Sequence, residues 1–393
     1  MTVWFAELKR RENLDEIVCE TLAQGWSAQH GTPFRVTCGA SAGERWVAQH
    51  LLGFYHPTDP SSRVRRFMAD AFRYSRRPIR VVPQWVMGTF AASPIGLRLL
   101  ATPAFTVTPA LPGSRDVAIW PGNQRVRVFD FGRGTCRVML KRGFAVRSMT
   151  TEITVRGNEA SGPFPPIFRF DEAHDWFEEP IVAGQNLARL PAWVPSAAYE
   201  AELFRRLGTW LERTARGMPA GEYVEGVRAE IVALAEAVES RFGGRWRSRA
   251  DGIGRRLFAT ASGLGDIPIA EGHGDLQRGN VLVTDKGEVL LVDWEHAGLR
   301  FRYYDHLVFG LSGRSPVGLG ERLVRFQRSG AIGLPGWALP EKGSALWRRA
   351  ASALYVLEET RWYLAENLTG VYRRPSRSVR QFFDEVDPVA SDL

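Results

Sequence analysis

Short runs in which apolar and polar residues alternate occupy the middle of the chain, from about residue 113 to residue 183. Such alternation places every second side chain on the same face of a β-strand. Val126 and Val128 precede the Gly-Arg-Gly at 132–134, and Val138 and Leu140 follow it, which predicts an antiparallel hairpin. The strands predicted in this part of the chain cover residues 117–120, 125–131, 136–141, 167–170 and 176–181.

Beyond residue 184 the apolar residues recur three or four positions apart, which is the spacing of an amphipathic helix. This spacing predicts helices over residues 197–217, 223–242, 250–261 and 345–367. The last helix carries an apolar stripe of Leu346, Ala350, Leu354, Leu357 and Tyr363. Its Glu358 and Glu359 either reach a bound acceptor or lie on an exposed helix face.

The first 112 residues show mixed patterns that predict helices over 14–25, 43–52 and 62–74. Small residues at 38–45 lack the Gly-Lys-Ser/Thr ending of a phosphate-binding loop, so we interpret them as the start of the second helix. We divide the chain into an amino-terminal extension of unknown role (1–112), a β-rich unit (113–183) and a mostly helical unit (184–393).

The chain is long enough for two domains, with 393 residues of which 45% are hydrophobic. Cys19, Cys38 and Cys136 show no metal-type spacing, so we expect three free thiols in a reducing compartment. The longest uncharged stretch, 81–97, contains Pro83 and Pro94 and is short for a spanning helix. No amino-terminal signal is apparent, and we expect a cytoplasmic protein.

The formal net charge is +8, and its most concentrated source is a basic segment, defined here as residues 63–80. This segment contains one acid, Asp70, and the arginines Arg63, Arg65, Arg66, Arg73, Arg76, Arg77 and Arg80. Such a cluster suits an anionic acceptor or surface, although a solvated face of the helix predicted over 62–74 explains it as well. No nucleic-acid-binding motif accompanies it, so no nucleic acid partner is expected.

The most specific pattern is Glu-Gly-His-Gly-Asp-Leu-Gln-Arg-Gly-Asn at 271–280, followed by an apolar strand and a second apolar run that ends at Asp293. Pairing of the two runs as a hairpin returns Asp293 to the neighbourhood of Asp275 and Asn280. Two carboxylates and an amide can hold Mg²⁺ against a nucleoside triphosphate and present a base to a hydroxyl. A polar turn does not explain the Asp-to-Asn interval together with the second Asp. We expect His273 to brace the loop.

These residues resemble the catalytic core of the aminoglycoside phosphotransferase and choline kinase group, which are relatives of the protein kinases. The group's catalytic loop reads roughly His-Gly-Asp-Leu-His-x-Gly-Asn, and its metal motif reads Ile-Asp-Trp-Glu. The matching residues are His273, Gly274, Asp275, Leu276, Gly279, Asn280, Asp293, Trp294 and Glu295, with Tyr304 and Asp305 in place of the later structural aspartate. Gln277 and Arg278 depart from the pattern. Arg278 either meets a phosphoryl group or an anionic acceptor, or is solvated.

The resemblance implies a two-lobed, protein-kinase-like α+β fold, with a small antiparallel β lobe and a large helical lobe. It implies Asp275 as the catalytic base or hydroxyl-orienting group, and Asn280 and Asp293 as Mg²⁺ ligands that also contact the nucleotide. It places the hinge between the lobes near residues 179–182.

The run Val-Met-Leu-Lys at 138–141 resembles the kinase strand whose Lys holds the nucleotide phosphates. Lys141 is therefore the candidate phosphate clamp, although an exposed Lys at a strand end stays open. Glu152 is the first candidate carboxylate for pairing with Lys141, and Glu159 is the second. The neighbours of Glu152 are poor helix formers, which disfavours the supporting helix there. The turn at 121–124 either covers the phosphates or simply connects two strands.

We therefore expect an ATP-dependent phosphotransferase that moves the γ-phosphate to a hydroxyl of a small molecule, with a sugar or glycoconjugate favoured. ATP and Mg²⁺ are the expected cofactors, and GTP stays open. The alternative is a catalytically silent kinase-fold scaffold that binds nucleotide and holds an anionic partner through the basic segment. A protein substrate is disfavoured because no activation segment ending in Ala-Pro-Glu follows Asp293.

Overall fold

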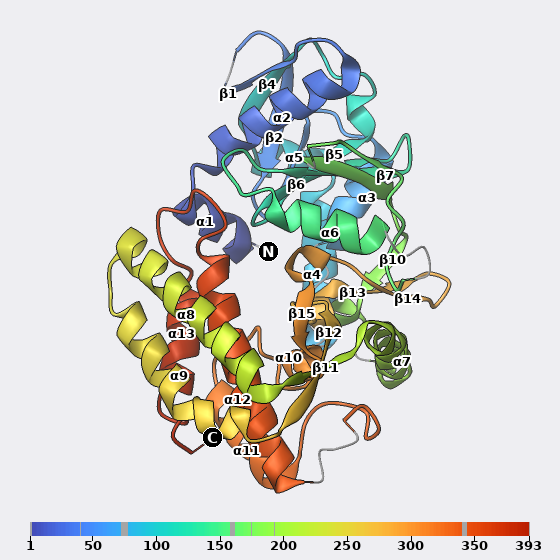
Figure 1. Ribbon diagram of the computed structural model, residues 1–393. Helices are drawn as coiled ribbons and strands as arrows, with labels where there is room; N and C mark the ends of the chain where they lie inside the picture. The colour runs from blue at the N-terminus through green and yellow to red at the C-terminus, as the bar shows by residue number, and fades with distance from the viewer. Residues whose placement is uncertain are drawn as a thin grey trace. The chain divides into compact units, whose positions relative to one another are not determined.

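The computed structural model describes residues 2–39, 41–71, 78–157, 162–173, 175–191, 193–339 and 344–392, without the side chains of residues 2–6 and 78–80. The chain forms two compact units (Figure 1). The β-rich unit comprises Met1–Ala160 and Phe164–Pro195, and the helical unit comprises Ser161–Pro163 and Ser196–Leu393. The predicted α+β class, with one antiparallel β-rich part and one mostly helical part, is confirmed.

The β-rich unit is built on a sheet whose nine described strands run in the order β1-β4-β2-β3-β5-β6-β7-β9-β8, with antiparallel neighbours throughout. The strands are β1 (Arg35–Cys38), β2 (Glu44–Gln49), β3 (Phe54–Pro57), β4 (Ala101–Thr108), β5 (Val117–Pro121), β6 (Arg125–Asp130), β7 (Thr135–Leu140), β8 (Arg169–Phe170) and β9 (Trp176–Pro180). A short strand β10 (Gly184–Asn186) follows. All five strands predicted between 117 and 181 are present.

Helices cover both faces of this sheet. Alternation along β5 places Val117 and Ile119 in one core, where they pack with α2, and Ala118 in another core with α3, α4 and α5. The helices of this unit are α1 (Thr2–Arg11), α2 (Leu14–His30), α3 (Ser62–Ala71), α4 (Pro78–Ala91), α5 (Pro94–Leu100) and α6 (Arg147–Gly157). α3 confirms the helix predicted from residue 62. Its Phe67 faces the protein and packs 4.7 Å from the ring of Phe129.

Residues 43–52 were predicted to be helical, and this prediction is wrong. Glu44–Gln49 form strand β2, which pairs with β3 on one side and β4 on the other, so the small residues at 38–45 do not start a helix. Trp46 and Ala48 are buried two positions apart on one face of this strand. Tertiary pairing on both sides decides the conformation here, over a local pattern that suits a helix as well.

The boundary predicted at residue 112 falls inside the β-rich unit. Strands β1–β4 belong to the same sheet as β5–β9, and Tyr55 of β3 pairs with Ile119 of β5. The amino-terminal residues therefore contribute part of the sheet instead of standing apart from it.

The helical unit contains the remaining helices and two small groups of strands. Its helices are α7 (Ala197–Thr214), α8 (Ala220–Phe242), α9 (Trp246–Ser262), α10 (Tyr304–Gly310), α11 (Leu319–Ser329), α12 (Ala345–Glu366) and α13 (Arg377–Val386). Strands β11 (Arg216–Pro219), β12 (Asp266–Gly272) and β15 (Gly298–Phe301) form an antiparallel sheet, and β13 (Val281–Thr284) pairs with β14 (Val289–Leu291) as the predicted hairpin.

Helix α12 lies at the centre of the helical unit's core together with α8 and α9. Its residues from Ala350 to Thr360 are all buried, whereas Leu346 at its start is 66% exposed. The interpretation of Glu358 and Glu359 as an exposed helix face is wrong, because both carboxylates are fully buried. Their burial requires nearby cations.

None of the helices in the described parts of the chain is both long and apolar enough to cross a bilayer. The three cysteines are free thiols, as predicted. Two of them meet across α2 and β1, where the sulfur atoms of Cys19 and Cys38 lie 2.7 Å apart.

Candidate active site

The catalytic loop, defined here as residues 273–280, connects β12 to β13. Asp305 at the start of α10 fixes its first residues, because its carboxylate accepts hydrogen bonds from the backbone N of His273 (2.6 Å) and of Gly274 (2.9 Å). Gly274 has φ +82°, and a Cβ there would lie 2.0 Å from the carbonyl oxygen of His296. The loop therefore needs glycine at this position. Asp305 has the structural role that the resemblance implies.

His273 braces the loop as expected. Its buried ring accepts a hydrogen bond at Nδ1 from the backbone N of Asp275 (3.2 Å), and its Nε2 contacts the carbonyl oxygen of Val292 (2.9 Å). The imidazole therefore joins the catalytic loop to the chain that leaves β14 and does not face a reacting group.

Asp275 and Asn280 are brought together by the loop. The Nδ2 of Asn280 donates to the backbone oxygen of Asp275 and to its Oδ2, both at 2.9 Å. The β13–β14 hairpin then brings the chain back to the end of the catalytic loop. There the backbone N of Val292 donates to the carbonyl oxygen of Asn280 at 3.0 Å. Asp293 is the next residue and adopts a left-handed conformation with φ +69°. Strand pairing thus brings the backbone next to Asp293 to Asn280, as the predicted hairpin requires.

Asn280 and Asp293 offer oxygen atoms of the kind that binds Mg²⁺. Both side-chain hydrogen bonds of Asn280 are made by its Nδ2, so its amide oxygen could bind a metal, and the carboxylate of Asp293 is the other candidate ligand. Within the described residues, no group of three or more His, Cys, Asp or Glu could hold a metal ion by itself. Magnesium is commonly held by one or two carboxylates and completed by substrate phosphates and water, which matches this sparse donor set.

Arg314, which no sequence pattern singled out, contacts Asp275 directly. Its Nε donates to Asp275 Oδ1, its Nη2 to the carbonyl oxygen of Gly274 (2.9 Å), and its Nη1 to Glu359. Its guanidinium carbon lies 3.6 Å from the centre of the Trp362 ring. Burial alone would lower the pKa of Arg314, but Glu359, Tyr304 and Asp275 hold that pKa well above its ordinary value. The site therefore contains a permanent buried cation.

Glu358, which precedes Glu359 on α12, is also held by hydrogen bonds. It accepts hydrogen bonds from Arg300 (2.9 Å), from Arg361 (2.6 Å) and from the hydroxyl of Tyr223. Burial raises the pKa of Glu358, and the neighbouring Arg361 opposes that shift. Each of these adjacent glutamates of α12 is therefore paired with an arginine from outside the helix, Arg300 for Glu358 and Arg314 for Glu359, and Glu358 also pairs with Arg361 of α12 itself.

Arg278, the departure from the family pattern, is partly exposed and pairs with a residue other than Asp275. Its Nη2 forms an ion pair with Glu200 of α7 at 2.8 Å, and its guanidinium lies 4.8 Å from the centre of the Phe309 ring. These contacts tie the catalytic loop to α7 and α10.

Lys141 and Glu152, which were predicted to pair, do not contact each other. Lys141 pairs with Glu12, and Glu152 pairs with Arg125 of β6 and Arg156 of α6. Lys141 lies at the end of β7 and is buried against the residue that follows α1, so the carboxylate comes from the amino terminus. Glu152 does lie on a helix, in spite of its poor helix-forming neighbours. Glu159 falls outside the described residues.

The buried pair of Lys141 and Glu12 is shifted towards its neutral forms. Burial lowers the pKa of Lys141 to about 8, against the opposing effect of Glu12, and burial also raises the pKa of Glu12. The Lys141 amine further donates to the carbonyl oxygen of Asn123 at 3.0 Å. The candidate phosphate clamp and the 121–124 turn are therefore in contact within the β-rich unit.

The basic segment is described only in part. Arg63 and Arg65 donate to the carbonyl oxygens of Phe131 (3.2 Å) and Pro60 (2.9 Å), and Arg66 is exposed. Its Arg73, Arg76 and Arg77 fall outside the described residues, and the side chain of Arg80 is not described.

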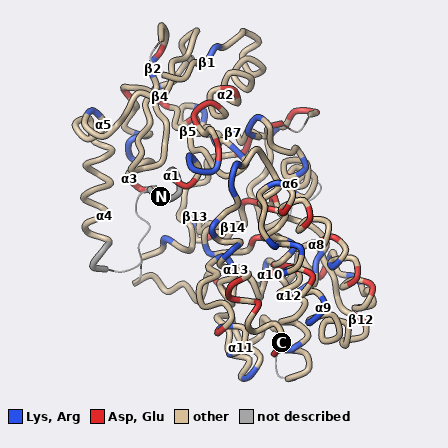
Figure 2. Tube along the Cα trace, turned by 90° about the vertical axis from the view of Figure 1, so that its left-hand side faces the viewer, with Lys and Arg blue, Asp and Glu red and all other residues tan. Residues whose placement is uncertain are grey.

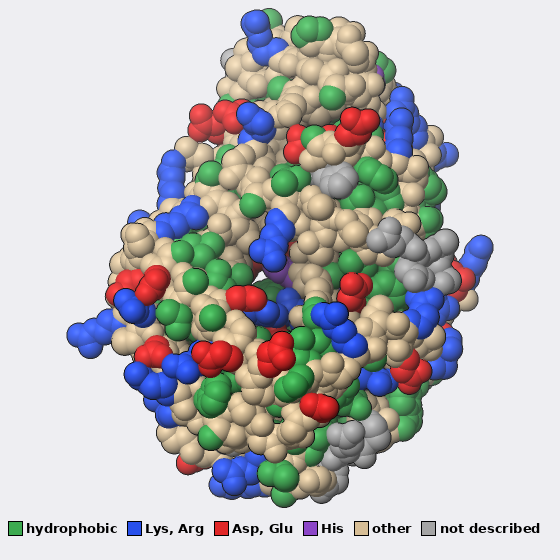
Figure 3. Space-filling view, viewed as in Figure 1, with side chains coloured by type: hydrophobic (Ala, Val, Ile, Leu, Met, Phe, Trp, Pro, Cys, Tyr) green, Lys and Arg blue, Asp and Glu red, His purple; other side chains and the backbone are tan. Residues whose placement is uncertain are grey.

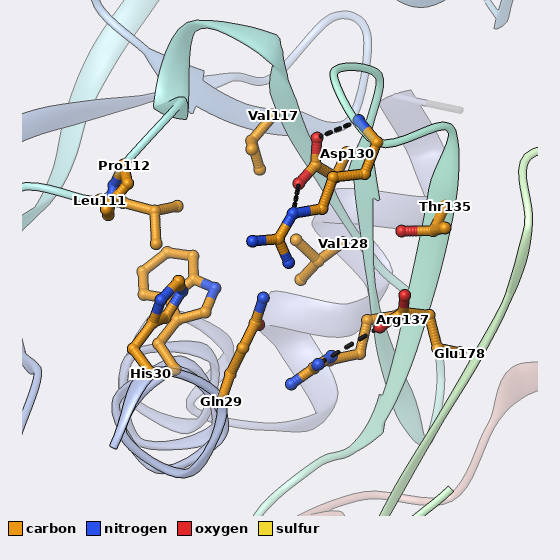
Figure 4. A pocket seen from close by; sticks show the side chains of 12 residues that line it. Gln29, His30, Leu111, Pro112, Val117, Val128, Asp130, Thr135, Arg137 and Glu178 are labelled. Carbon is orange, nitrogen blue, oxygen red and sulfur yellow. Dashed lines mark hydrogen bonds and ion pairs between the residues drawn. The ribbon is translucent and has the colours of Figure 1, made fainter. Parts of the chain in front are cut away.

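A small hollow of the β-rich unit lies between α2 and strands β5–β7 (Figure 4). Asp130 and Arg133 pair at one end of it, and Arg137 and Glu178 at the other. Its volume of about 30 Å³ holds little more than water. It belongs to a different unit from Asp275, so we assign no acceptor to it.

Comparison with known proteins decides the class of this site. Residues 170–341 match the model of the phosphotransferase enzyme family. The match covers less than half of the chain. The matched residues include the catalytic loop and Asp293, so the predicted resemblance is confirmed, and with it the class of a phosphotransferase of the small-molecule kinase type. No curated protein matches this chain by sequence.

Solved structures similar to this chain include a choline/ethanolamine kinase family protein from Mesorhizobium loti. The two chains are 15% identical over 70% of this chain and 87% of that one, with a TM-score of 0.42. Choline kinase LicA from Streptococcus pneumoniae has 15% identity over 69% and 90% of the two chains, with a TM-score of 0.43. Aminoglycoside phosphotransferase APH(4)-Ia, in a ternary complex with ADP and hygromycin B, has 14% identity over 70% and 93%, with a TM-score of 0.40. With all three TM-scores below 0.5, no conclusion about this chain rests on them.

Proposed function

We propose that this phosphotransferase moves the γ-phosphate of ATP to a hydroxyl group of a small molecule, with Asp275 at the reacting centre. The observation that carries the proposal is the pair of 2.9 Å hydrogen bonds from Asn280 to Asp275, in a loop braced by Asp305 and His273. Phosphoryl transfer depends mainly on positioning and charge neutralisation, and a loop held at both ends supplies the positioning.

The roles of the residues follow from their chemistry. Asp275 accepts the proton of the acceptor hydroxyl while the hydroxyl oxygen bonds to the γ-phosphorus, and the bond to the β-phosphate breaks to release ADP. Asn280 and Asp293 would hold Mg²⁺, which neutralises phosphate charge when it is bound. Lys141, beside the 121–124 turn, is the proposed phosphate clamp of the β-rich unit.

The test is transfer of label from ATP in the presence of Mg²⁺ to separate pools of sugars, aminoglycosides, nucleosides and small alcohols. Transfer to one pool, lost in Asp275→Asn, is the expected result. Loss of a positioned base commonly lowers the rate by about 10² to 10⁴, whereas ATP affinity should stay nearly unchanged in the variant. Equal turnover by Asp275→Asn would remove Asp275 from the mechanism.

A nucleotide-binding scaffold without turnover is the second candidate. One observation favours it, because Asp275 Oδ1 is occupied by Arg314 and the Lys141 amine by Glu12. Such a scaffold would bind ATP with unchanged affinity in Asp275→Asn and transfer no label to any of the four pools.

A further inference from the structure

Helices α4 and α5 of the β-rich unit expose an apolar surface, which we call the α4–α5 face. It is made of Val82, Trp85, Val86, Met87 and Phe90 of α4 with Ile95, Leu99 and Leu100 of α5. Val82 is 65% exposed and Leu99 is 70% exposed. Apolar residues scattered singly over a surface are ordinary, whereas eight exposed apolar residues on two helices that contact each other are typical of an interaction site.

Only a narrow side of α4 is used for packing within its own unit. Ala91 and Gly88 are buried, and Ala91 joins the core formed with α3 and α5, while the exposed residues point elsewhere around the helix. Figure 2 shows α4 and α5 along one edge of the β-rich unit. Among the described residues, Val82, Met87 and Leu99 are therefore about half or more exposed while α4 is held through Ala91.

The stretch of sequence that contains α4 and α5 carries charge of one sign. No Asp or Glu occurs between Asp70 and Asp116, whereas this interval contains the arginines Arg73, Arg76, Arg77, Arg80, Arg98 and Arg115. Arg98 on α5 and Arg66 on α3 are exposed among the described residues. Elsewhere the two signs are mixed, as Figure 3 shows for the face seen there, where basic and acidic side chains are interspersed.

We propose that the α4–α5 face binds the surface of an anionic lipid bilayer. An occupant must offer negative charge to the arginines and hydrocarbon to the exposed apolar residues, and the interface of an anionic bilayer offers both. The 14 residues of α4 span about 21 Å, which is less than the hydrocarbon thickness of a bilayer. The helix therefore lies along the interface.

The test is sedimentation of the full chain with vesicles of phosphatidylcholine alone and with added phosphatidylglycerol, at low and high salt. The variant carries Val82→Glu and Leu99→Glu. A matched control carries Val317→Glu and Leu346→Glu, whose native side chains are 63% and 66% exposed in the helical unit. Circular dichroism checks that each variant is folded.

The native chain and the control should bind the anionic vesicles, more strongly at low salt, and the α4–α5 variant should lose more than about tenfold in partitioning. Failure of the native chain to bind, or an equal loss in the control, overturns the proposal. If light scattering instead shows a native dimer that the α4–α5 variant abolishes, without vesicle binding, the face is a protein interface and the proposal is wrong. Phosphate transfer plays no part in any of these outcomes.

Discussion

Both carboxylate oxygens of Asp275 are held by other side chains. Oδ1 accepts from Arg314, and Oδ2 accepts from Asn280 (2.9 Å) and Gln277 (3.2 Å). A carboxylate fixed at both oxygens keeps one orientation, which suits a group that must align an acceptor hydroxyl. Arg314 is therefore a positioning residue for the proposed reaction, acting through Asp275.

Replacing Arg314 tests this network. Arg314→Met leaves Asp275 and the buried Glu359 without their shared cation, and breaking a buried pair from one side costs about 3–5 kcal/mol of stability. Arg314→Lys should recover part of that stability, but its single ammonium cannot donate in three fixed directions, so turnover should stay low. Urea denaturation and the transfer assay measure the two effects.

The matched control for Arg314 is Arg247→Met, since Arg247 pairs with Glu236 at an exposed place. Exposed pairs contribute about 0–1 kcal/mol. Equal denaturation midpoints for the two methionine variants would show that the network around Arg314 does not stabilise the unit.

Asp293→Ala should weaken the Mg²⁺-dependent part of ATP binding, because it removes a hard oxygen ligand and leaves the catalytic loop in place. Calorimetry of ATP with and without Mg²⁺ separates that part from the rest. If Mg²⁺ raises ATP affinity equally in the native protein and in Asp293→Ala, the metal is bound by other residues.

Among the structural elements, α6 is fixed to the sheet by a chain of buried ion pairs. Glu152 pairs with Arg125 of β6 and with Arg156, and Arg156 pairs in turn with Glu179 of β9. Burial alone would raise the pKa of Glu152, but Arg125 and Arg156 hold this pKa down to about 2. A carboxylate with a depressed pKa contributes stability that is present above its ordinary pKa and is lost as pH falls towards the folded value.

The free energies of unfolding of the native protein and of Glu152→Gln should therefore differ most at neutral pH. This difference should shrink as the pH falls from about 4.5 to about 2. The pKa shift corresponds to a change on the order of 3 kcal/mol. Urea midpoints over this pH range measure it. Glu202→Gln is the control, because the pKa of Glu202 is also lowered to about 2, by Arg205 and Arg206, but at a partly exposed place where solvent screens the pairs. A pH-independent difference for Glu152→Gln would contradict the assignment.

Elements with a strong repeating pattern could be predicted from the sequence, and elements fixed by distant partners could not. The β13–β14 hairpin and α8 follow from local periodicity, and the proximity of Asp275 and Asn280 follows from their spacing. Strand β2 depends on pairing with two other strands. The partners of Lys141 and Glu359 are Glu12 and Arg314, which lie 129 and 45 residues away along the chain. No local pattern encodes such contacts.

At the scale of the whole molecule, the amino-terminal residues complete the sheet that carries Lys141, the candidate phosphate clamp. The core that contains Val117, Val126 and Val128 also contains Val18 and Trp26 of α2. Lys141 obtains its carboxylate from Glu12. Residues 1–112 therefore supply apolar cover, a neighbouring strand and a buried counter-charge to the strands that follow.

A chain that begins at residue 113 should consequently fail to fold on its own. It would expose the α2-facing side of β5–β7, turn β5 into a free edge where Ile119 now pairs with Tyr55, and leave Lys141 without Glu12. Open edges and large apolar surfaces cause aggregation, so we expect little soluble protein. Co-expression of residues 1–112 as a separate fragment should restore solubility by completing the sheet. A soluble, cooperatively unfolding 113–393 chain without that fragment would show that the amino-terminal residues form an independent extension after all.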